Sequence, residues 1–277
     1  MITGTPSLTR ITGSIGVELH GIDLRDGIDD AVIGLLRTAV AEHHVVVLRD
    51  QFLSAEQHAA VATAFGPILA SPVQLAVGSR RAGPAVSTIE DTAERPPAGF
   101  PWHSDLSWSE QPPSLGFLSA VTIPPVGGDT LWASTAAVFD ALPFDVQQRC
   151  SQSRIRFEPD ESLLASVERH HGVRVADRLR REHPGIAHPL VHSNPITGRR
   201  SLRLSPLDAR CLAGPAVDDP TLLGQLHSML DDPHVQMRWR WREGDLVIWD
   251  EAATCHRALT DHHPQRRVMR RCVTGPA

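Results

Sequence analysis

The segment FPWHSDLSW, residues 100–108, holds a histidine and an aspartate two positions apart, His103 and Asp105. In an extended segment, residues i and i+2 project to the same face, about 6.5 to 7 Å apart along the backbone, so an imidazole and a carboxylate can converge on one metal ion. With 15 histidines and 32 acidic residues in the chain, roughly one or two His-x-Asp/Glu matches are expected by chance. The pair therefore needs a third ligand and a supporting context from elsewhere.

The segments on the two sides of this pair differ in character. Residues 92–101 (TAERPPAGFP) are rich in proline, glycine and charge, which predicts a mobile surface loop that leads into His103 and could act as a lid. After the pair, strands are predicted over 115–122 and 130–133, separated by the turn 124–129. We therefore expect the pair on a loop beside strands.

The first third of the chain predicts strands with two covering helices. Residues 8–24 mix β-branched residues with glycines, which is typical of short strands joined by tight turns. Residues 28–43 carry apolar positions at helical spacing, and 45–48 form a continuous apolar run that indicates a buried strand. Ser54 and Gln57 form a capping box that begins the second helix.

Residues 158–183 interrupt the β pattern with a charged stretch of high helix propensity. A solvated helix inserted between strands is the simpler interpretation. A flap or lid that contacts a substrate is the alternative.

The rest of the chain returns to strands. Residues 186–192 and 201–204 predict a hairpin around a turn at 194–198, and Pro220 is expected at the first position of a helix that ends near Leu230. Further strands are predicted at 236–242, 246–249 and 267–274. This pattern predicts a mainly β fold with covering helices (α+β), of sandwich or jelly-roll type. Because no repeat, linker or low-complexity segment divides residues 1–277, a single domain is expected.

Composition excludes several classes of protein. The hydrophobic fraction is 41% and the charged fraction 21%, which are ordinary values for a folded globular chain. A net charge of −5 gives no electrostatic reason to expect nucleic acid or an anionic membrane as partner. The four cysteines are far apart and form no Cys-x-x-Cys pair, so we expect a reducing cytoplasm rather than a disulfide framework. No signal peptide or membrane-spanning apolar run is apparent.

A second stretch carries a more specific signal. It is WRWREGDLVIWDEAATCH, residues 239–256, followed by PQRRVMRR at 264–271. Together with PWHSD, GGDTLWA at 127–133 and GVELHGIDL at 16–24, it resembles the family of taurine dioxygenase and 2,4-dichlorophenoxyacetate dioxygenase over about residues 8–274. These proteins are non-haem oxygenases that use Fe(II), 2-oxoglutarate and O2. The resemblance implies a double-stranded β-helix (jelly-roll, cupin-like) core.

The resemblance also implies a set of site residues. It makes His103, Asp105 and His256 the iron ligands and the catalytic centre, a two-histidine-one-carboxylate triad that leaves three coordination positions open. Arg267, eleven residues after His256, matches the arginine that pairs with the distal carboxylate of 2-oxoglutarate. Thr130 matches the threonine that adds a hydrogen bond to the same carboxylate.

The implied substrate contacts are less uniform. Arg271 matches the arginine that binds the anionic end of the substrate in the taurine enzyme. Ser71 and Gln74 stand where that enzyme has a histidine and a tyrosine, so taurine itself is not expected. Arg203 stands where an aromatic contact is usual; it could hold a second anionic group, although an exposed strand arginine is the simpler interpretation. Trp108 is a further candidate substrate contact.

The expected activity is hydroxylation of a small, anionic organic substrate, a sulfonate, sulfate ester or carboxylate, with release of succinate and CO2. A biosynthetic tailoring oxygenase that hydroxylates or desaturates an amino acid or natural product is the first alternative. A non-catalytic jelly roll that binds a metal or a small acid is an alternative of another class. The expected partner is a small-molecule substrate, and a homo-oligomer, dimer or tetramer, is left open.

Overall fold

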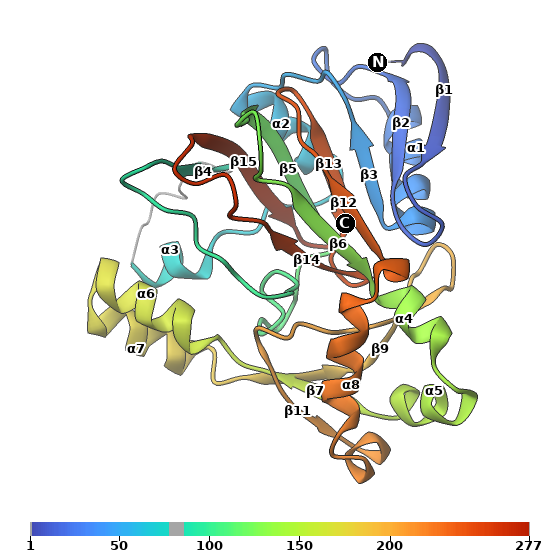
Figure 1. Ribbon diagram of the computed structural model, residues 1–277, viewed down its shortest axis with the longest axis vertical. Coiled ribbons are helices and arrows are strands. Elements are labelled where there is room, and N and C mark those ends of the chain that lie inside the picture. The colour runs from blue at the N-terminus through green and yellow to red at the C-terminus, as the bar shows by residue number, and fades with distance from the viewer. Residues whose placement is uncertain (1, 78–85, 277) are drawn as a thin grey trace.

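Figure 1 shows the computed structural model, which describes residues 2–77 and 86–276. Within these residues the largest sheet has seven strands, in the order β1-β2-β3-β13-β5-β15-β4. Neighbouring strands are antiparallel except for β2 and β3. The central strand β13 lies between β3 and β5, so the sheet joins both halves of the chain. Its strands are β1 (Ile2–Arg10), β2 (Val17–Ile22), β3 (Val45–Leu48), β4 (Ser87–Asp91), β5 (Leu115–Thr122), β13 (Leu246–Asp250) and β15 (Arg267–Thr274).

A second sheet packs against the first. It contains β6 (Thr130–Ser134), β12 (Gln236–Trp239) and β14 (Thr254–Ala258), with β6 in the centre. Apolar side chains fill the space between the sheets, and the rings of Trp132 and Trp249 meet edge to face with centroids 5.8 Å apart. The two packed sheets form the jelly-roll core that the sequence predicted.

Strand β3 shows how the large sheet buries both faces. Its four residues are fully buried, which fits their continuous apolar run. Val45 and Val47 point into the sandwich, whereas Val46 and Leu48 face the covering helices, as the two-residue period of a strand requires. Those helices are α1 (Asp30–His43) and α2 (Ala55–Thr63). The predicted capping box of α2 is present.

The remaining elements pack below the sandwich in Figure 1 around an apolar core of their own. The helices are α3 (Pro72–Ala76), α4 (Thr135–Ala141), α5 (Phe144–Ser151), α6 (Glu161–His171), α7 (Val173–Glu182) and α8 (Leu222–Ser228), with short 3-10 turns at Pro215–Asp218, Met229–Asp231 and Pro233–Val235. The strands are β7 (Arg154–Phe157), β8 (Ile186–Pro189), β9 (Val191–Ser193), β10 (Arg200–Leu202) and β11 (Ala209–Ala213).

The predicted helical stretch at 158–183 is confirmed as two helices, α6 and α7. Gly172 separates them with a φ of +88°, a conformation that suits glycine. The prediction for Pro220 is wrong, because α8 begins at Leu222 with Thr221 as its N-cap residue.

The predicted hairpin between 186–192 and 201–204 is only partly correct. A short hairpin is present between β9 and β10. The residues before it, in β8, pair instead with β7, which the sequence did not indicate. Leu190 lies between these strands and is fully buried.

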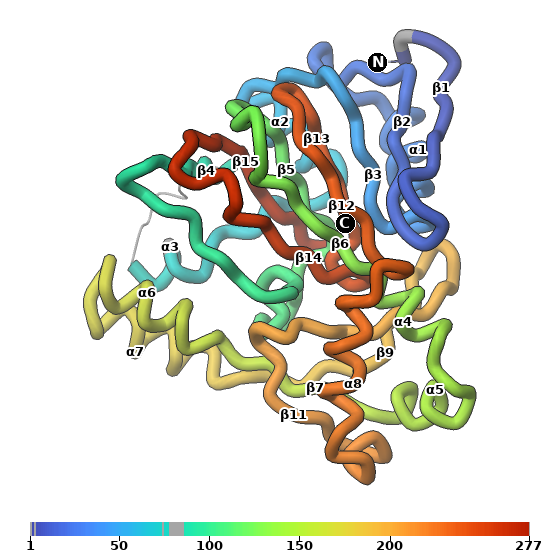
Figure 2. The backbone as a smooth tube through the Cα atoms, viewed as in Figure 1, coloured from blue at the N-terminus to red at the C-terminus, as the bar shows by residue number. Residues whose placement is uncertain are grey.

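Segments far apart in the chain meet at the open end of the sandwich. In Figure 2 the green segment between β4 and β5 runs alongside the red strands β14 and β15. An isolated antiparallel bridge joins His103 to His256 there. The fold thus brings both conspicuous sequence motifs to one place.

Candidate active site

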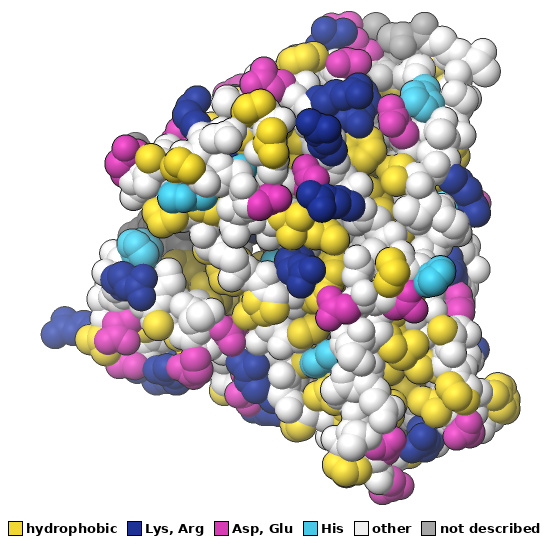
Figure 3. Space-filling model, viewed as in Figure 1, with side chains coloured by type: hydrophobic (Ala, Val, Ile, Leu, Met, Phe, Trp, Pro, Cys, Tyr) yellow, Lys and Arg dark blue, Asp and Glu magenta, His cyan; other side chains and the backbone are white. Residues whose placement is uncertain are grey.

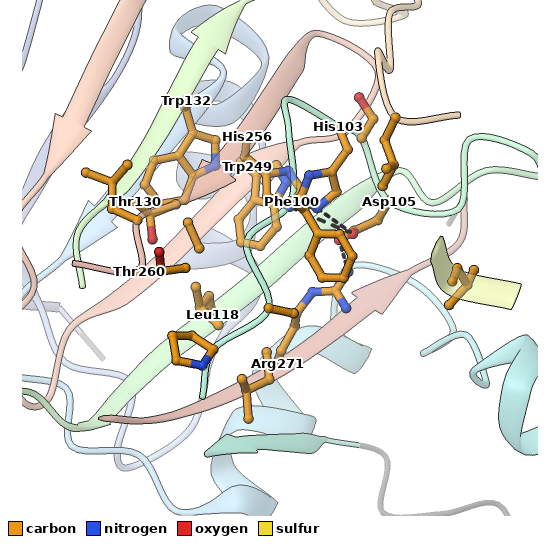
Figure 4. A pocket seen from close by; sticks show the side chains of 18 of the residues that line it. Phe100, His103, Asp105, Leu118, Thr130, Trp132, Trp249, His256, Thr260 and Arg271 are labelled. Atoms are coloured by element: carbon orange, nitrogen blue, oxygen red, sulfur yellow. Dashed lines mark ion pairs between the residues drawn. The ribbon is translucent and has the colours of Figure 1, made fainter. Parts of the chain in front are cut away.

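Three side chains with metal-ligand chemistry converge beside this bridge. His256 lies on β14, and His103 and Asp105 lie on the segment that the bridge ties to it. The nearest Asp105 oxygen is 3.9 Å from His103 Nε2 and 3.8 Å from His256 Nε2. One ligand atom from each residue lies within 4.8 Å of the others, a separation that a single ion can span. Figure 4 shows the three side chains pointing toward one another.

The imidazole of His103 is oriented by the backbone. Its Nδ1 donates to the carbonyl of Pro101 at 2.9 Å, which directs Nε2 toward Asp105. Burial, and then the positive charge of Arg271, lower the pKa of His103 to about 4, and burial holds the pKa of His256 well below its usual range. Both imidazoles are therefore neutral near pH 7, which is the form that binds a metal.

Ser104, between His103 and Asp105, is anchored on both sides. Its hydroxyl donates to the carbonyl of Thr254 at 2.7 Å, and its backbone N–H donates to Ser205 Oγ at 3.3 Å. Ser205 in turn donates to the carboxylate of Asp208, which also accepts from Ser107 at 2.7 Å. Burial raises the pKa of Asp208 to about 6. This network ties the segment with the two candidate ligands to β14.

Asp105 has two further polar neighbours. Its backbone N–H donates to Glu251 Oε2 at 3.0 Å, and burial raises the pKa of Glu251 to about 8. Its carboxylate forms an ion pair with Arg271, which reaches in from β15 (Figure 4). The position of Asp105 is thus fixed through both its backbone and its side chain.

A second positive group lies deeper in the same cavity. Arg267 is only 5% exposed; its Nε donates to the carbonyl of Gly128 at 3.1 Å, and its Nη1 is 3.9 Å from Asp91. Its Nη2 has no hydrogen-bond partner among the described residues. Nearby, Trp241 donates to Thr130 Oγ1 at 3.0 Å, which leaves the threonine hydroxyl hydrogen available to a ligand oxygen. A guanidinium nitrogen without a partner and a hydroxyl in the same cavity are suited to bind a carboxylate.

The two arginines and the three candidate ligands line one cavity of about 350 Å³. Much of its wall is apolar and comes from three segments of the chain, namely Pro97, Ala98, Phe100, Leu106 and Trp108 between β4 and β5, Leu163 of α6, and Leu207. Figure 3 shows the surface hollowed between the α6–α7 pair and β4, with hydrophobic side chains visible inside. Leu163 belongs to α6, so the charged helical segment does contribute to the cavity wall.

The structure separates the predicted substrate residues into two groups. Arg271 and Trp108 line the cavity. Ser71 is the N-cap residue of α3 and is not among the lining residues, and the side chain of Gln74 lies outside the described part. Arg203 is mostly buried but does not line this cavity; its Nη2 lies 3.3 Å from His192 Nδ1.

Four polar residues at this site were not found by sequence reasoning. Glu251 and Asp208 hold the segment of the candidate ligands in place, and His262 and Asp91, 3.3 Å apart, flank Arg267. Glu251 stood inside the WDEAATCH motif, so its position offered a signal. The others lie in segments without a recognisable spacing, and only the fold brings them together.

Comparison with known proteins identifies the family. Residues 7–273 match the model described as "Taurine catabolism dioxygenase TauD, TfdA family". The chain belongs to this family. It is therefore a non-haem oxidoreductase, a dioxygenase that depends on Fe(II), 2-oxoglutarate and O2.

Individual members of the TauD/TfdA family are similar over most of their length. The chain is 30% identical to an alkylsulfatase of Acinetobacter baylyi, over 95% of this chain and 83% of that protein. It is 29% identical to an alpha-ketoglutarate-dependent sulfate ester dioxygenase of Pseudomonas putida, over 94% and 86%. A taurine dioxygenase structure from Burkholderia xenovorans superposes with a TM-score of 0.79 at 27% identity, covering 99% of this chain and 92% of that one. No helix in the described part is long and apolar enough to cross a membrane.

Proposed function

We propose that this TauD/TfdA-family dioxygenase hydroxylates a small organic anion at the carbon next to its charged group. The observation that carries the proposal is the pair of arginines on β15, Arg267 and Arg271, which both line one cavity. Residues i and i+4 of a strand share a face. Arg267 binds the co-substrate, and Arg271 binds the substrate.

His103, Asp105 and His256 would hold Fe(II). Two neutral imidazoles and a carboxylate suit this ion and leave coordination positions open for the co-substrate and for oxygen. When bound, the iron supplies the oxidative chemistry that converts 2-oxoglutarate to succinate and CO2. The protein's own contribution is to hold the ligands, orient both organic molecules and exclude water from the cavity.

Arg267 and Thr130 would bind the distal carboxylate of 2-oxoglutarate. The unpartnered Nη2 of Arg267 and the hydroxyl of Thr130 support this assignment. Arg267 is buried with Asp91 as a carboxylate neighbour at 3.9 Å, and its Nη2 remains without a partner among the described residues, so the site favours an anionic ligand.

Arg271, whose ion pair with Asp105 uses Nη2, would bind the anionic group of the substrate through its remaining N–H groups. Trp108 with its apolar neighbours would pack against the organic part. Among sulfonates, sulfate esters and carboxylates, we favour a sulfate ester of an alkyl alcohol, because similar proteins carry the names alkylsulfatase and sulfate ester dioxygenase. Hydroxylation next to the ester oxygen would release sulfate and an aldehyde. Ser71, Gln74 and Arg203 are not needed for this arrangement.

We propose a cytoplasmic location from the state of the cysteines. All four cysteines are free thiols, which supports a reducing cytoplasm. A small molecule is the proposed partner, with no role for nucleic acid or a membrane surface. A homo-oligomer is compatible with this proposal.

The test is succinate formation with Fe(II), 2-oxoglutarate and O2, measured with alkyl sulfates, sulfonates, aryloxy acids and amino acids. We expect alkyl sulfates to stimulate turnover and to release sulfate. Arg271→Met should raise the substrate KM at least about tenfold with a much smaller effect on the KM for 2-oxoglutarate. Arg270→Met is the matched control, because Arg270 points to the opposite face of β15, where its guanidinium donates to the backbone carbonyl of Leu53.

Three outcomes would contradict the proposal. An unchanged substrate KM in Arg271→Met would remove the anion from that position. Absence of succinate under all conditions, together with absence of Fe(II) binding, would favour a non-catalytic binding protein. Stimulation by amino acids alone would favour a tailoring oxygenase.

A further inference from the structure

A second cavity of about 440 Å³ lies apart from the proposed active site. It is formed between the last turns of α1 and the connection from β9 to β10, which approaches the lower end of α1 in Figure 1. None of its lining residues lines the cavity that holds Arg267 and Arg271. A molecule bound in it would occupy a site with a different lining, although Arg203 also lines a small cavity of about 20 Å³ that Asp105 and Glu251 reach.

Arg203 supplies a mostly buried positive charge to this second cavity. Its Nη2 donates to Nδ1 of His192 at 3.3 Å. Burial lowers the pKa of His192 to about 4, so this imidazole is a neutral acceptor near pH 7. Among the described residues, Arg203 forms no ion pair, and Asp250 is the acidic group whose charge it feels. The guanidinium thus lacks the anion that a buried arginine normally has.

The nearby carboxylate of Asp250 is already engaged. One oxygen accepts the backbone N–H groups of Ala252 and Ala253, and the other accepts the side-chain amide of Asn194 at 3.2 Å. Asp250, which also lines the cavity, therefore reduces the local positive charge without forming an ion pair with Arg203.

The other walls decide the chemical class of the ligand. A second cation, Arg37, lines the cavity while it stacks on the ring of Phe65 at 5.3 Å. The remaining surface is largely apolar and includes Val40, Ala41, Pro113, Leu115, Pro195 and Ile196. A planar carboxylate matches the fork of a guanidinium, and an apolar body matches these walls.

We propose that this cavity is a second ligand site, which binds a small organic carboxylate through Arg203. The apolar body of the ligand lies between α1 and the β9–β10 connection. The site does not depend on the proposed oxidation chemistry, because it shares no lining residue with the active-site cavity.

The probe is 4-fluorobenzoate, followed by fluorine NMR. The full chain is kept anaerobic with Fe(II) and saturating 2-oxoglutarate, so that the proposed co-substrate site is filled. We expect saturable binding that persists in Arg271→Met. Arg203→Met should weaken binding at least about tenfold, whereas Arg203→Lys should weaken it less because it keeps the charge. Arg199→Met is the matched control, because Arg199 pairs with Asp140 outside the cavity.

A variant that leaves Arg203 intact guards against a folding defect. Ile196 is 58% exposed at the cavity, so Ile196→Trp can be accommodated and should obstruct entry. We expect weaker binding in Ile196→Trp, with Fe(II) and 2-oxoglutarate binding unchanged.

Three results would overturn the proposal. One is the absence of saturable binding to the unmodified protein. Another is binding that Arg271→Met removes and Arg203→Met does not. The third is displacement of 4-fluorobenzoate by an equal concentration of inorganic sulfate, which would mean that the apolar walls contribute nothing.

Discussion

His103 and His256 face each other as an antiparallel backbone pair. The N–H of His103 donates to the carbonyl of His256 at 3.1 Å, and the N–H of His256 donates back at 2.8 Å. Their ring centroids are 4.2 Å apart. The spacing of the two imidazoles is therefore set by the backbone pairing, and the ion requires little rearrangement of the chain when it binds.

Removal of the third candidate ligand tests the metal centre. Asp105→Ala should weaken Fe(II) binding by at least about 100-fold and abolish succinate formation, because two imidazoles alone hold the ion poorly. Fe(II) titration and far-UV circular dichroism would show the loss with the fold retained. Asp145→Ala, an exposed aspartate on α5, is the control. Full activity in Asp105→Ala would remove Asp105 from the ligand set.

Glu251 is expected to position Asp105. Glu251→Ala removes the acceptor of the Asp105 N–H, which should cost about 1 to 3 kcal/mol of stability and weaken Fe(II) binding about 10- to 100-fold. Glu251→Gln keeps an acceptor oxygen and should recover most of the affinity. Equal Fe(II) affinity in all three proteins would show that this contact does not orient the ligand.

Gly128 is expected to fix the place of Arg267. A Cβ at Gly128 would lie 3.0 Å from Arg267 Cδ, and the φ of +74° also disfavours other residues. Gly128→Ala should therefore raise the KM for 2-oxoglutarate several-fold and leave Fe(II) affinity unchanged. Gly34→Ala is the control, because Gly34 lies in α1 with nothing within 4 Å of its added Cβ. An unchanged KM in Gly128→Ala would mean that Arg267 has room to move.

His44 should make stability depend on pH. Burial lowers its pKa from 6.5 to about 4, so the folded state resists a proton that the unfolded chain accepts. Stability therefore falls as pH drops below about 6.5 and levels off near pH 4. Between pH 7.5 and pH 5 the contribution of His44 is a loss of about 2 kcal/mol.

The measurement is urea unfolding at both pH values, with His44→Asn as the comparison. Asparagine tolerates the φ of +66° at this position and does not titrate. The free energy of unfolding of the variant should fall less on acidification. Parallel losses in both proteins would assign the acid sensitivity to other groups.

Much of the core was predictable because its signals are local. The continuous run in β3 and the capping box of α2 each depend on neighbouring residues, and both predictions are confirmed. Elements below the sandwich were harder to predict. Strands β7, β8 and β11 have four or five residues and pair with strands distant in the sequence, which a short sequence window does not contain.

The site divides in the same way. The sequence motifs pointed to the three candidate ligands, His103, Asp105 and His256, and the structure brings them together. Arg203 illustrates the limit, because its neighbours come from α1 and the β9–β10 connection, and no sequence spacing reveals which cavity a side chain enters. Asp208 is similar, because its role depends on two serines from other segments.

The spacing of the two arginines on strand β15 affects which carbon of the substrate is oxidised. Arg267 and Arg271 are four residues apart on one strand, a span of about 13 Å when extended. If both anions are held by this strand, the oxidised carbon is fixed by its distance from the headgroup and not by the length of the tail. Homologous substrates of different chain length would then be cut at the same bond, with tail length changing only how tightly each one is held.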